Sequence, residues 1–467
     1  MKRPLANFLS LLTGDLGSRV LGFFISVYLA RVLEPNGFGI ISIGLAVLGY
    51  LQLAGSPGIQ VLETRNVAAV TEVDRARVNA VLSMRLTLAA ILWVLTALVV
   101  WMAVSESETR DVVLLFGLSL FPLALNVDWF FQGKEEFLAV SSSRIVQYVS
   151  YAAMVFFFVR GQTDARSTAV AFGLGVSTAV VVLWIWYMRK WGPPRLRWSP
   201  GIWKVILKDG IPVGAAMFLA QSVTNFPPLV IGYFAGAGEV GMFASAMKLV
   251  FLMMIVDRIL NALFLPAATR YFSFERDDFP RLAETTLRVV LLAVIPIALC
   301  GIILSKELVT FVFGTGYIGG TPLLRILLVF FVLTVVNSVF VCVLIASGNE
   351  GRYTRVVTMG SMVLCGATLT GAATYGAAGT AWGVVLGELV TTFLMGKEAL
   401  KIARLPLGSL FIRPFLAAVC AGAVAVVLNE VDAFVLALVA VFVYVCLTIA
   451  LKGITLKEIR FLRERFV

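Results

Sequence analysis

Long apolar stretches separated by short polar loops run through almost all of this 467-residue chain. The hydrocarbon core of a bilayer is about 30 Å thick, so a helix needs ~20 mostly apolar residues to cross it. Because the apolar runs reach that length and do not alternate with period two, they predict membrane-spanning helices and an all-α fold. About fourteen candidate spans follow, at residues 8–30, 40–62, 80–103, 111–131, 138–159, 167–188, 211–233, 241–265, 284–304, 323–346, 355–372, 377–396, 411–428 and 433–450.

The composition indicates a polytopic membrane protein and argues against enzyme chemistry. Hydrophobic residues make up 60% of the chain, against about 45–50% in soluble domains. The chain contains no histidine, which excludes histidine proton relays, zinc sites built on histidine and histidine-based catalytic triads. It also lacks the G-x-x-x-x-G-K-[ST] phosphate-binding motif, and its five cysteines lie within predicted spans without paired spacing. We therefore expect no metal, no cofactor, no enzyme activity and no direct use of ATP.

The charged loops predict the orientation of the chain. Outside the spans, lysine and arginine gather in alternate loops, and the other set of loops holds Arg31, Arg110, Arg160, Arg166 and Lys306. Since short basic loops stay in the cytoplasm, both termini are predicted to be cytoplasmic. The formal net charge of +11 then favours anionic lipid headgroups as partners. Because these charges are dispersed over short loops, nucleic-acid binding is not favoured.

Linker composition divides the chain into four parts. Residues 1–190 are predicted to form a six-helix bundle, and residues 191–209 a cytoplasmic amphipathic linker with Trp198, Ile202, Trp203, Ile206 and Leu207 at the lipid headgroups. A second six-helix bundle is predicted over residues 210–400. Residues 401–467 would add two spans and a cytoplasmic amphipathic helix that ends the chain.

Two features repeat between the predicted bundles. The turn at Glu34–Phe38 resembles the turn at Glu239–Phe243, and both contain glycine. Asp15 and Arg19 in the first span correspond to Gln221 and Asn225 in the seventh. Each pair is spaced i,i+4 and therefore shares one helix face. Such repeats are typical of transporters, although chance similarity between apolar helices is the alternative.

Polar residues within the spans are the candidate binding groups, because charge at bilayer depth costs at least ~2.5–3.5 kcal/mol and usually faces a cavity. Asp15 and Arg19 lie on a polar stripe of the first span, where they either line a cavity or neutralise each other. Lys248 and Arg258 in the eighth span are predicted to face the same cleft. Basic groups on both bundles favour an anionic ligand such as a phosphate.

Other charged residues in the spans receive different interpretations. Arg85 and Arg144 lie near cytoplasmic span ends, from which their side chains can extend to the headgroups. Asp257 points away from the predicted cleft and is expected to anchor a neighbouring helix. Glu388, in the middle of its span, is the first candidate for ion coupling, with Asp15 the second, because a carboxylate within the membrane can carry a proton.

The segment after the fourth span carries a family resemblance. Asn126–Phe137 reads NVDWFFQGKEEF and resembles the D-W-[FL]-[FY]-Q-G-x-E segment of polysaccharide biosynthesis flippases, the O-antigen-type branch of the multidrug/oligosaccharidyl-lipid/polysaccharide exporter superfamily. The Leu33–Gly39 turn is similar to the L-x-P-x-x-[FY]-G turn of that family, with Pro35 displaced by one position. Read from the residues alone, Asp128 and Gly133 cap a helix and form a turn, and Trp129 suits a membrane interface.

The resemblance implies a V-shaped pair of bundles that opens alternately to each side of the bacterial inner membrane. Its substrate would be an undecaprenyl-pyrophosphate-linked oligosaccharide, an O-antigen or lipopolysaccharide repeat unit, with polysaccharide polymerase and assembly proteins as partners. Asp128, Trp129, Gln132 and Gly133 would lie at the cytoplasmic mouth. A lipid II flippase, a multidrug cation exporter and, from a different class, a membrane polysaccharide polymerase or ligase remain alternatives.

Overall fold

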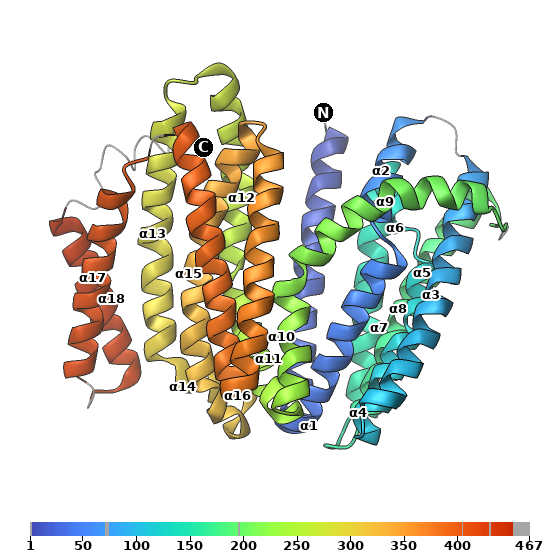
Figure 1. Ribbon diagram of the computed structural model, residues 1–467, viewed down its shortest axis with the longest axis horizontal. Helices are drawn as coiled ribbons and strands as arrows, with labels where there is room; N and C mark the ends of the chain where they lie inside the picture. The colour runs from blue at the N-terminus through green and yellow to red at the C-terminus, as the bar shows by residue number, and fades with distance from the viewer. Residues whose placement is uncertain (1, 71–73, 195–196, 404, 429–430, 452–467) are drawn as a thin grey trace. The chain divides into compact units, whose positions relative to one another are not determined.

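The computed structural model describes residues 2–70, 74–194, 197–403, 405–428 and 431–451, except for the side chains of residues 2–16, 407 and 409. The described chain is helical and contains no strand (Figure 1), which confirms the predicted fold class. Ten of its helices are long and apolar enough to cross a membrane, so the chain is a multi-pass membrane protein. The predicted helix after residue 451 lies outside the described residues.

The number of crossings stays a prediction. Two of the ten spans, Gly17–Gly55 and Glu350–Ala403, belong to helices with non-helical residues inside them. At 1.5 Å per residue, a 54-residue helix would be roughly 80 Å long, more than twice the bilayer core. Each of these helices therefore accommodates two of the spans expected from the sequence.

The chain forms two compact units, Met1–Gly241 and Met242–Val467. The boundary between the units lies later than predicted. The span at residues 211–233, which the sequence assigned to the second bundle, belongs to the first unit. The first unit contains helices α1 (Lys2–Gly55), α2 (Ile59–Ala69), α3 (Arg75–Ala103), α4 (Ser107–Leu118), α5 (Leu120–Ala124), α6 (Asp128–Gly133), α7 (Phe137–Phe158), α8 (Ala165–Trp191), α9 (Pro200–Ala220) and α10 (Ser222–Phe234). Helix α11 (Ala237–Met253) begins at its end and continues into the second unit.

The two segments predicted as repeated turns differ in structure: Glu34–Phe38 contains the interruption of α1, whereas Glu239–Phe243 lies within α11 and is helical, so the second predicted turn is wrong. Glu34 interrupts α1 with a φ of 56°, a left-handed conformation that few residues other than glycine adopt. A Cβ atom on Gly39 would lie 1.7 Å from the Ala237 carbonyl oxygen, and one on Gly241 would lie 1.9 Å from that of Pro35. The backbones therefore approach closely at Gly39 and Gly241, although Gly39 lies just outside the predicted turn and Gly241 corresponds to Asn36 in the predicted repeat.

Helix α9 crosses the end of the first unit beside α2 and α3 (Figure 1). Trp198, just before it, is 66% exposed. Ile206 is buried in a core cluster with residues of α2, α3 and α6, and Ile202, Trp203 and Leu207 pack against that cluster. The prediction of a place at the lipid headgroups is therefore wrong for Ile206 and stays a prediction for the partly exposed residues. The apolar face of α9 covers the end of the helical unit because that end presents large apolar side chains of its own.

The second unit contains α12 (Ile255–Phe274), α13 (Phe279–Ile303), α14 (Ser305–Phe313), the 3₁₀ helix η1 (Thr315–Gly320), α15 (Thr321–Ala346), α16 (Glu350–Ala403), α17 (Leu407–Val427) and α18 (Ala433–Ala450). Helices α17 and α18 pack together and against α13 (Figure 1). Tyr444 of α18 is fully buried there with Ala417 and Ala421 of α17. The small alanines make room for the large ring, which holds the last two described helices on the unit.

Helix α16 folds back on itself at Tyr375 and Gly376, whose backbone angles are not helical. Glycines at 379, 383 and 387 repeat every four residues on its second half and face Gly371, Ala367 and Leu364 of the first half. The pairing runs in opposite directions along the chain, as in a helical hairpin. This spacing is the small-residue repeat that lets membrane helices approach closely.

Candidate functional site

The D-W-F-F-Q-G segment forms the short helix α6, which Asp128 begins and Gly133 ends. The carboxylate of Asp128 accepts a hydrogen bond from the Trp129 backbone N–H at 2.8 Å and a longer one from Gln132 Nε2 at 3.4 Å. Its own backbone N–H donates to Asn126 Oδ1 at 2.8 Å. The Asp128 carboxylate therefore bonds to groups within α6, but the N-cap residue is Val127 and makes no side-chain cap bond, so Asp128 is not the helix cap that the sequence predicted.

Trp129 is 1% exposed and lies in the core cluster of this end of the unit. The prediction that it anchors the protein at a membrane interface is therefore wrong. Its carbonyl oxygen accepts from Thr64 Oγ1 at 3.2 Å. Its indole Nε1 is buried and has no hydrogen-bond partner among the described residues. A buried indole N–H without an acceptor is costly and points to an occupant or a rearrangement.

Gly133 allows α6 to lie directly against α2. A Cβ atom at this position would lie 2.7 Å from the Thr64 carbonyl oxygen and 2.8 Å from Val67 Cβ. No larger residue fits without separating the two helices. The glycine of the motif is thus explained by close packing.

Arg85 joins α3 to this corner and does not extend toward the headgroups, so the sequence interpretation of its side chain is wrong. It is 6% exposed. Its guanidinium donates to Ser56 Oγ, to the Asn126 carbonyl oxygen and to the Leu123 carbonyl oxygen, each at 2.7 Å. Since the carbonyls flank the start of α6, this arginine fixes α6 relative to α3.

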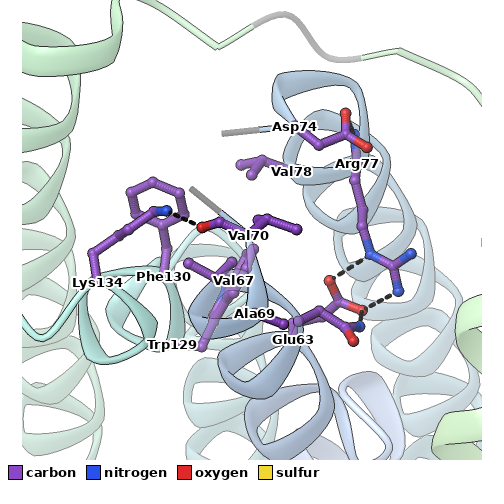
Figure 2. A pocket seen from close by; sticks show the side chains of 11 residues that line it. Glu63, Val67, Ala69, Val70, Asp74, Arg77, Val78, Trp129, Phe130 and Lys134 are labelled. Carbon is purple, nitrogen blue, oxygen red and sulfur yellow. Dashed lines mark hydrogen bonds and ion pairs between the residues drawn. The ribbon is translucent and has the colours of Figure 1, made fainter. Parts of the chain in front are cut away.

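A cavity of about 260 Å³ opens between α2, α6 and the start of α3. Figure 2 shows an ion pair on one side of it, in which Arg77 binds the Glu63 carboxylate through Nε at 2.9 Å and Nη2 at 2.8 Å. Asn66 Nδ2 adds a third hydrogen bond to Glu63 at 3.1 Å. On the other side, Lys134 Nζ donates to the Val70 carbonyl oxygen at 2.8 Å. The cavity thus combines charged groups with the apolar side chains of Val67, Val78 and Phe130.

Sequence reasoning missed Glu63 and Arg77 as site residues. Glu63 is 1% exposed although the sequence places it at the end of a span, next to a basic loop. A bidentate arginine–carboxylate pair of this kind satisfies both groups and makes the burial tolerable. The sequence offered no distinct signal for this pair, because the predicted loop of residues 63–79 holds three acidic and three basic residues.

The remaining predicted residues of the first unit lie in different surroundings. Arg19 is exposed on α1, and the side chain of Asp15 lies outside the description. Gln221 is exposed at the junction of α9 and α10. Asn225 is buried against α1, where a Cβ atom on Gly49 would approach its Nδ2 to 2.5 Å. The predicted i,i+4 pair therefore consists of one exposed side-chain amide, Gln221, and one buried side-chain amide, Asn225.

In the second unit, Lys248 is half-buried on α11, and Arg258 is exposed on α12. The helix is interrupted at Met254 between them. Helical periodicity therefore cannot be used to place both side chains on one face. Asp257 accepts hydrogen bonds from Ser338 of α15 and from Asn261. It therefore anchors a neighbouring helix, as the sequence predicted.

Glu388 is 7% exposed and accepts a hydrogen bond from Asn337 Nδ2 of α15 at 3.1 Å. The carbonyl oxygen of the same amide is buried and unpartnered within the described part of the chain. Glu388 also directly follows Gly387 of the α16 hairpin, so hairpin packing positions its carboxylate.

These helical units define a multi-pass membrane protein, whose fold is similar to those of solved flippases and transporters. Residues 5–272 match the family described as polysaccharide biosynthesis protein. The chain belongs to this family, as its D-W-F-F-Q-G segment predicted. No curated protein matches the sequence.

Three solved structures illustrate the fold. The lipid II flippase MurJ in an inward closed conformation has a TM-score of 0.73 at 14% identity, covering 95% of this chain and 98% of that one. An inward-facing multidrug resistance MATE family transporter of the MOP superfamily has a TM-score of 0.66 at 16% identity, covering 83% and 95%. A MOP superfamily transporter from Pyrococcus furiosus has a TM-score of 0.52 at 16% identity, covering 85% of this chain and 94% of that one.

Proposed function

We propose that this protein moves an undecaprenyl-pyrophosphate-linked oligosaccharide, an O-antigen-type repeat unit, across the bacterial inner membrane, with both termini in the cytoplasm. The observation that carries the proposal is the match to the polysaccharide biosynthesis family over residues 5–272, in a chain with a flippase-type fold. The alternating charge of the loops supports the orientation. Polysaccharide polymerase and assembly proteins are proposed as partners that use the exported repeat unit.

The proposed pyrophosphate ligands are Arg19 and Lys248, with Arg258, Asp15, Gln221 and Asn225 as further polar groups of the transport path. Arg19 is exposed on its helix. No ion pair of Lys248 occurs within the described residues, so the ammonium group is available to an anion. Lysine and arginine bind phosphate through charge-assisted hydrogen bonds, which strengthen where water is scarce.

For energy coupling we propose an ion gradient acting at Glu388, with Asp15 as the second candidate. Glu388 is buried, and the amide oxygen of Asn337 beside it is unpartnered among the described residues. A carboxyl group beside an unpartnered amide oxygen can bind a proton or a monovalent cation, because the proton or cation interacts with the oxygens of both groups. In membrane vesicles, Glu388→Gln should then make transport independent of the gradient.

Genetic complementation tests the substrate class. The chain should restore polysaccharide export to a strain lacking its oligosaccharide-lipid flippase. The lipid II alternative, which the fold likeness to MurJ favours, predicts instead rescue of a strain depleted of its lipid II flippase. Rescue of drug resistance would indicate the multidrug exporter.

Variants test the proposed ligands in the same strain. Arg19→Ala and Lys248→Ala should each abolish export at unchanged membrane level. Lys306→Ala removes an exposed basic residue that is not among the proposed ligands, and it should leave export intact. Normal export by the Arg19→Ala, Lys248→Ala double variant would overturn this assignment.

A further inference from the structure

The open end of the α16 hairpin, opposite its turn, carries a compact group of charged side chains. Arg352 of the first half binds the Glu398 carboxylate of the second half through Nη1 at 3.3 Å, and Lys401 binds the same carboxylate. Lys397 makes no ion pair within the described residues, and its ammonium lies 4.4 Å from the centre of the Phe393 ring. Three basic side chains around one carboxylate leave positive charge in excess.

The neighbouring sequence does not cancel that excess. Glu350 and Arg355, in the first turns of α16, balance each other. Arg404, which directly follows α16 in the sequence, is basic. The last part of the chain, after Leu451, holds five basic and two acidic residues. Taken together, these segments add positive charge, so the open end of the hairpin favours an anion.

Contacts between the two halves of α16 fix which residues lie at the same depth. A Cβ atom on Gly360 would lie 1.9 Å from Thr391 Oγ1, so these two residues lie side by side. The ion pair across the open end gives the same register. Because the halves run in opposite directions, residues 356–363 of the first half lie level with residues 388–395 of the second.

Exposed apolar side chains continue from the charged end along one side of the hairpin. They come from both halves: Met359, Val363, Leu386 and Phe393. Counted at about 100° per residue from the positions in contact, these four side chains and Lys397 fall on the same side. Glu388 lies on the other side, where it accepts the hydrogen bond from α15. The exposed surface is therefore distinct from the proposed coupling site.

The order of these groups along α16 matches the order of groups in a phospholipid. At 1.5 Å per residue, Lys397 lies about 9 Å before the end of α16, close to the boundary between headgroups and hydrocarbon. Glu398 occupies one nitrogen of the Arg352 guanidinium, which has five N–H donors. Arg352 and Lys397 can therefore bind one phosphate together by charge-assisted hydrogen bonds.

We infer that this side of the α16 hairpin binds an anionic phospholipid. Its headgroup phosphate lies at Lys397 and Arg352, and one acyl chain follows Phe393 and the apolar row. A zwitterionic headgroup fits less well, because its own cation would meet the basic side chains. The bound lipid links the two halves of α16 at their open end. The inference requires neither transport nor the proposed substrate, so it stands or falls separately from the proposed function.

Native mass spectrometry of the full-length chain in a neutral detergent tests the inference. The probes are phosphatidylglycerol and phosphatidylcholine with the same acyl chains. The first phosphatidylglycerol should bind more tightly than phosphatidylcholine. Lys397→Ala should weaken phosphatidylglycerol binding about fivefold, the factor expected for one basic residue near an anionic headgroup, and should leave phosphatidylcholine binding unchanged. Lys397→Arg should preserve the preference.

Two further variants separate this site from general attraction to a basic protein. Lys208→Ala removes one exposed positive charge from α9 of the first unit, and it should leave both lipid affinities unchanged. Phe393→Ala removes part of the apolar row and should weaken both lipids. Because Lys397 is exposed and makes no ion pair among the described residues, Lys397→Ala should unfold at the same temperature as the unaltered chain.

Three results would overturn the inference. The first is equal affinity of the unaltered chain for the two lipids. The second is an equal loss of phosphatidylglycerol binding in Lys208→Ala and Lys397→Ala, which would indicate attraction to total charge. The third is displacement of phosphatidylglycerol by inorganic phosphate at the same concentration, which would indicate an anion site that does not hold a lipid chain.

Discussion

The glycine repeat of the α16 hairpin gives a sharp prediction for Gly383→Ala. The added Cβ would lie 2.6 Å from the Thr368 backbone nitrogen and 2.7 Å from the Ala367 carbonyl carbon and oxygen. Ordinary van der Waals contact begins at 3.4 Å, so the facing backbone must recede by about 1 Å. Backbone within a packed hairpin cannot rotate away as a flexible side chain can.

Overpacking of this kind costs about 1–3 kcal/mol, whereas replacing glycine by alanine within a helix gains about 1 kcal/mol. Gly366→Ala is the matched control, because it lies on the same helix and a Cβ there meets no atom within 4 Å among the described residues. Since the helix-propensity gain is common to both variants, Gly383→Ala should be about 1–3 kcal/mol less stable than Gly366→Ala.

The assay is thermal unfolding of both variants purified in the same detergent, followed by scattering and tryptophan fluorescence. Gly383→Ala should also weaken transport, because the half of α16 that it displaces carries Glu388. Equal stability of the two variants would refute the reasoning, since it would show that the two halves of α16 do not pack as closely as their backbones indicate.

Three further variants test other parts of the structure. Arg85→Met should cost about 1–3 kcal/mol in thermal unfolding, because it removes the guanidinium bond to the Asn126 carbonyl oxygen, whereas the Leu123 carbonyl oxygen keeps a bond from the Asn126 backbone N–H at 3.2 Å, and wild-type stability would contradict the role assigned to Arg85. Gly133→Ala should lower both stability and export by forcing α6 away from α2, and an unchanged export rate would show that this contact is dispensable. Truncation at Gly453 should reduce membrane abundance with little change in transport per molecule; a truncated chain present at full level but inactive would place the tail in the mechanism.

The periodicity and length of the apolar runs predicted a helical membrane protein correctly. Both depend on the surrounding bilayer and not on contacts between particular residues. The segment of Asp128 and Gly133 does form a short helix, but Val127 and Lys134 occupy its cap positions and no side chain caps its start. The aligned segments at Glu34–Phe38 and Glu239–Phe243 were detected as a repeat. Their packing on each other could not be predicted. The only trace of a close backbone approach in a sequence is a glycine, and a glycine does not identify the segment that it contacts.

The errors concern side chains whose surroundings are set by distant segments. Arg85 was expected to reach the headgroups, but the carbonyl oxygens of Leu123 and Asn126, about forty residues away in sequence, bind it in the interior. Trp129 suits an interface by residue type and is buried instead by α2 and α9. Glu63 and Arg77 received no interpretation as site residues, because a single sequence does not reveal that they pair.

Reconstituted transport tests the central claim most directly. Vesicles containing the full-length chain are loaded with a fluorescent undecaprenyl-pyrophosphate-linked oligosaccharide in one leaflet, and its arrival in the other leaflet is measured with an impermeant lectin. We expect transfer far faster than in protein-free vesicles, and a rate near that background for the Arg19→Ala, Lys248→Ala variant. Transfer by the unaltered chain at the protein-free rate, with the substrate and the ion gradient present, would contradict the assignment as a flippase.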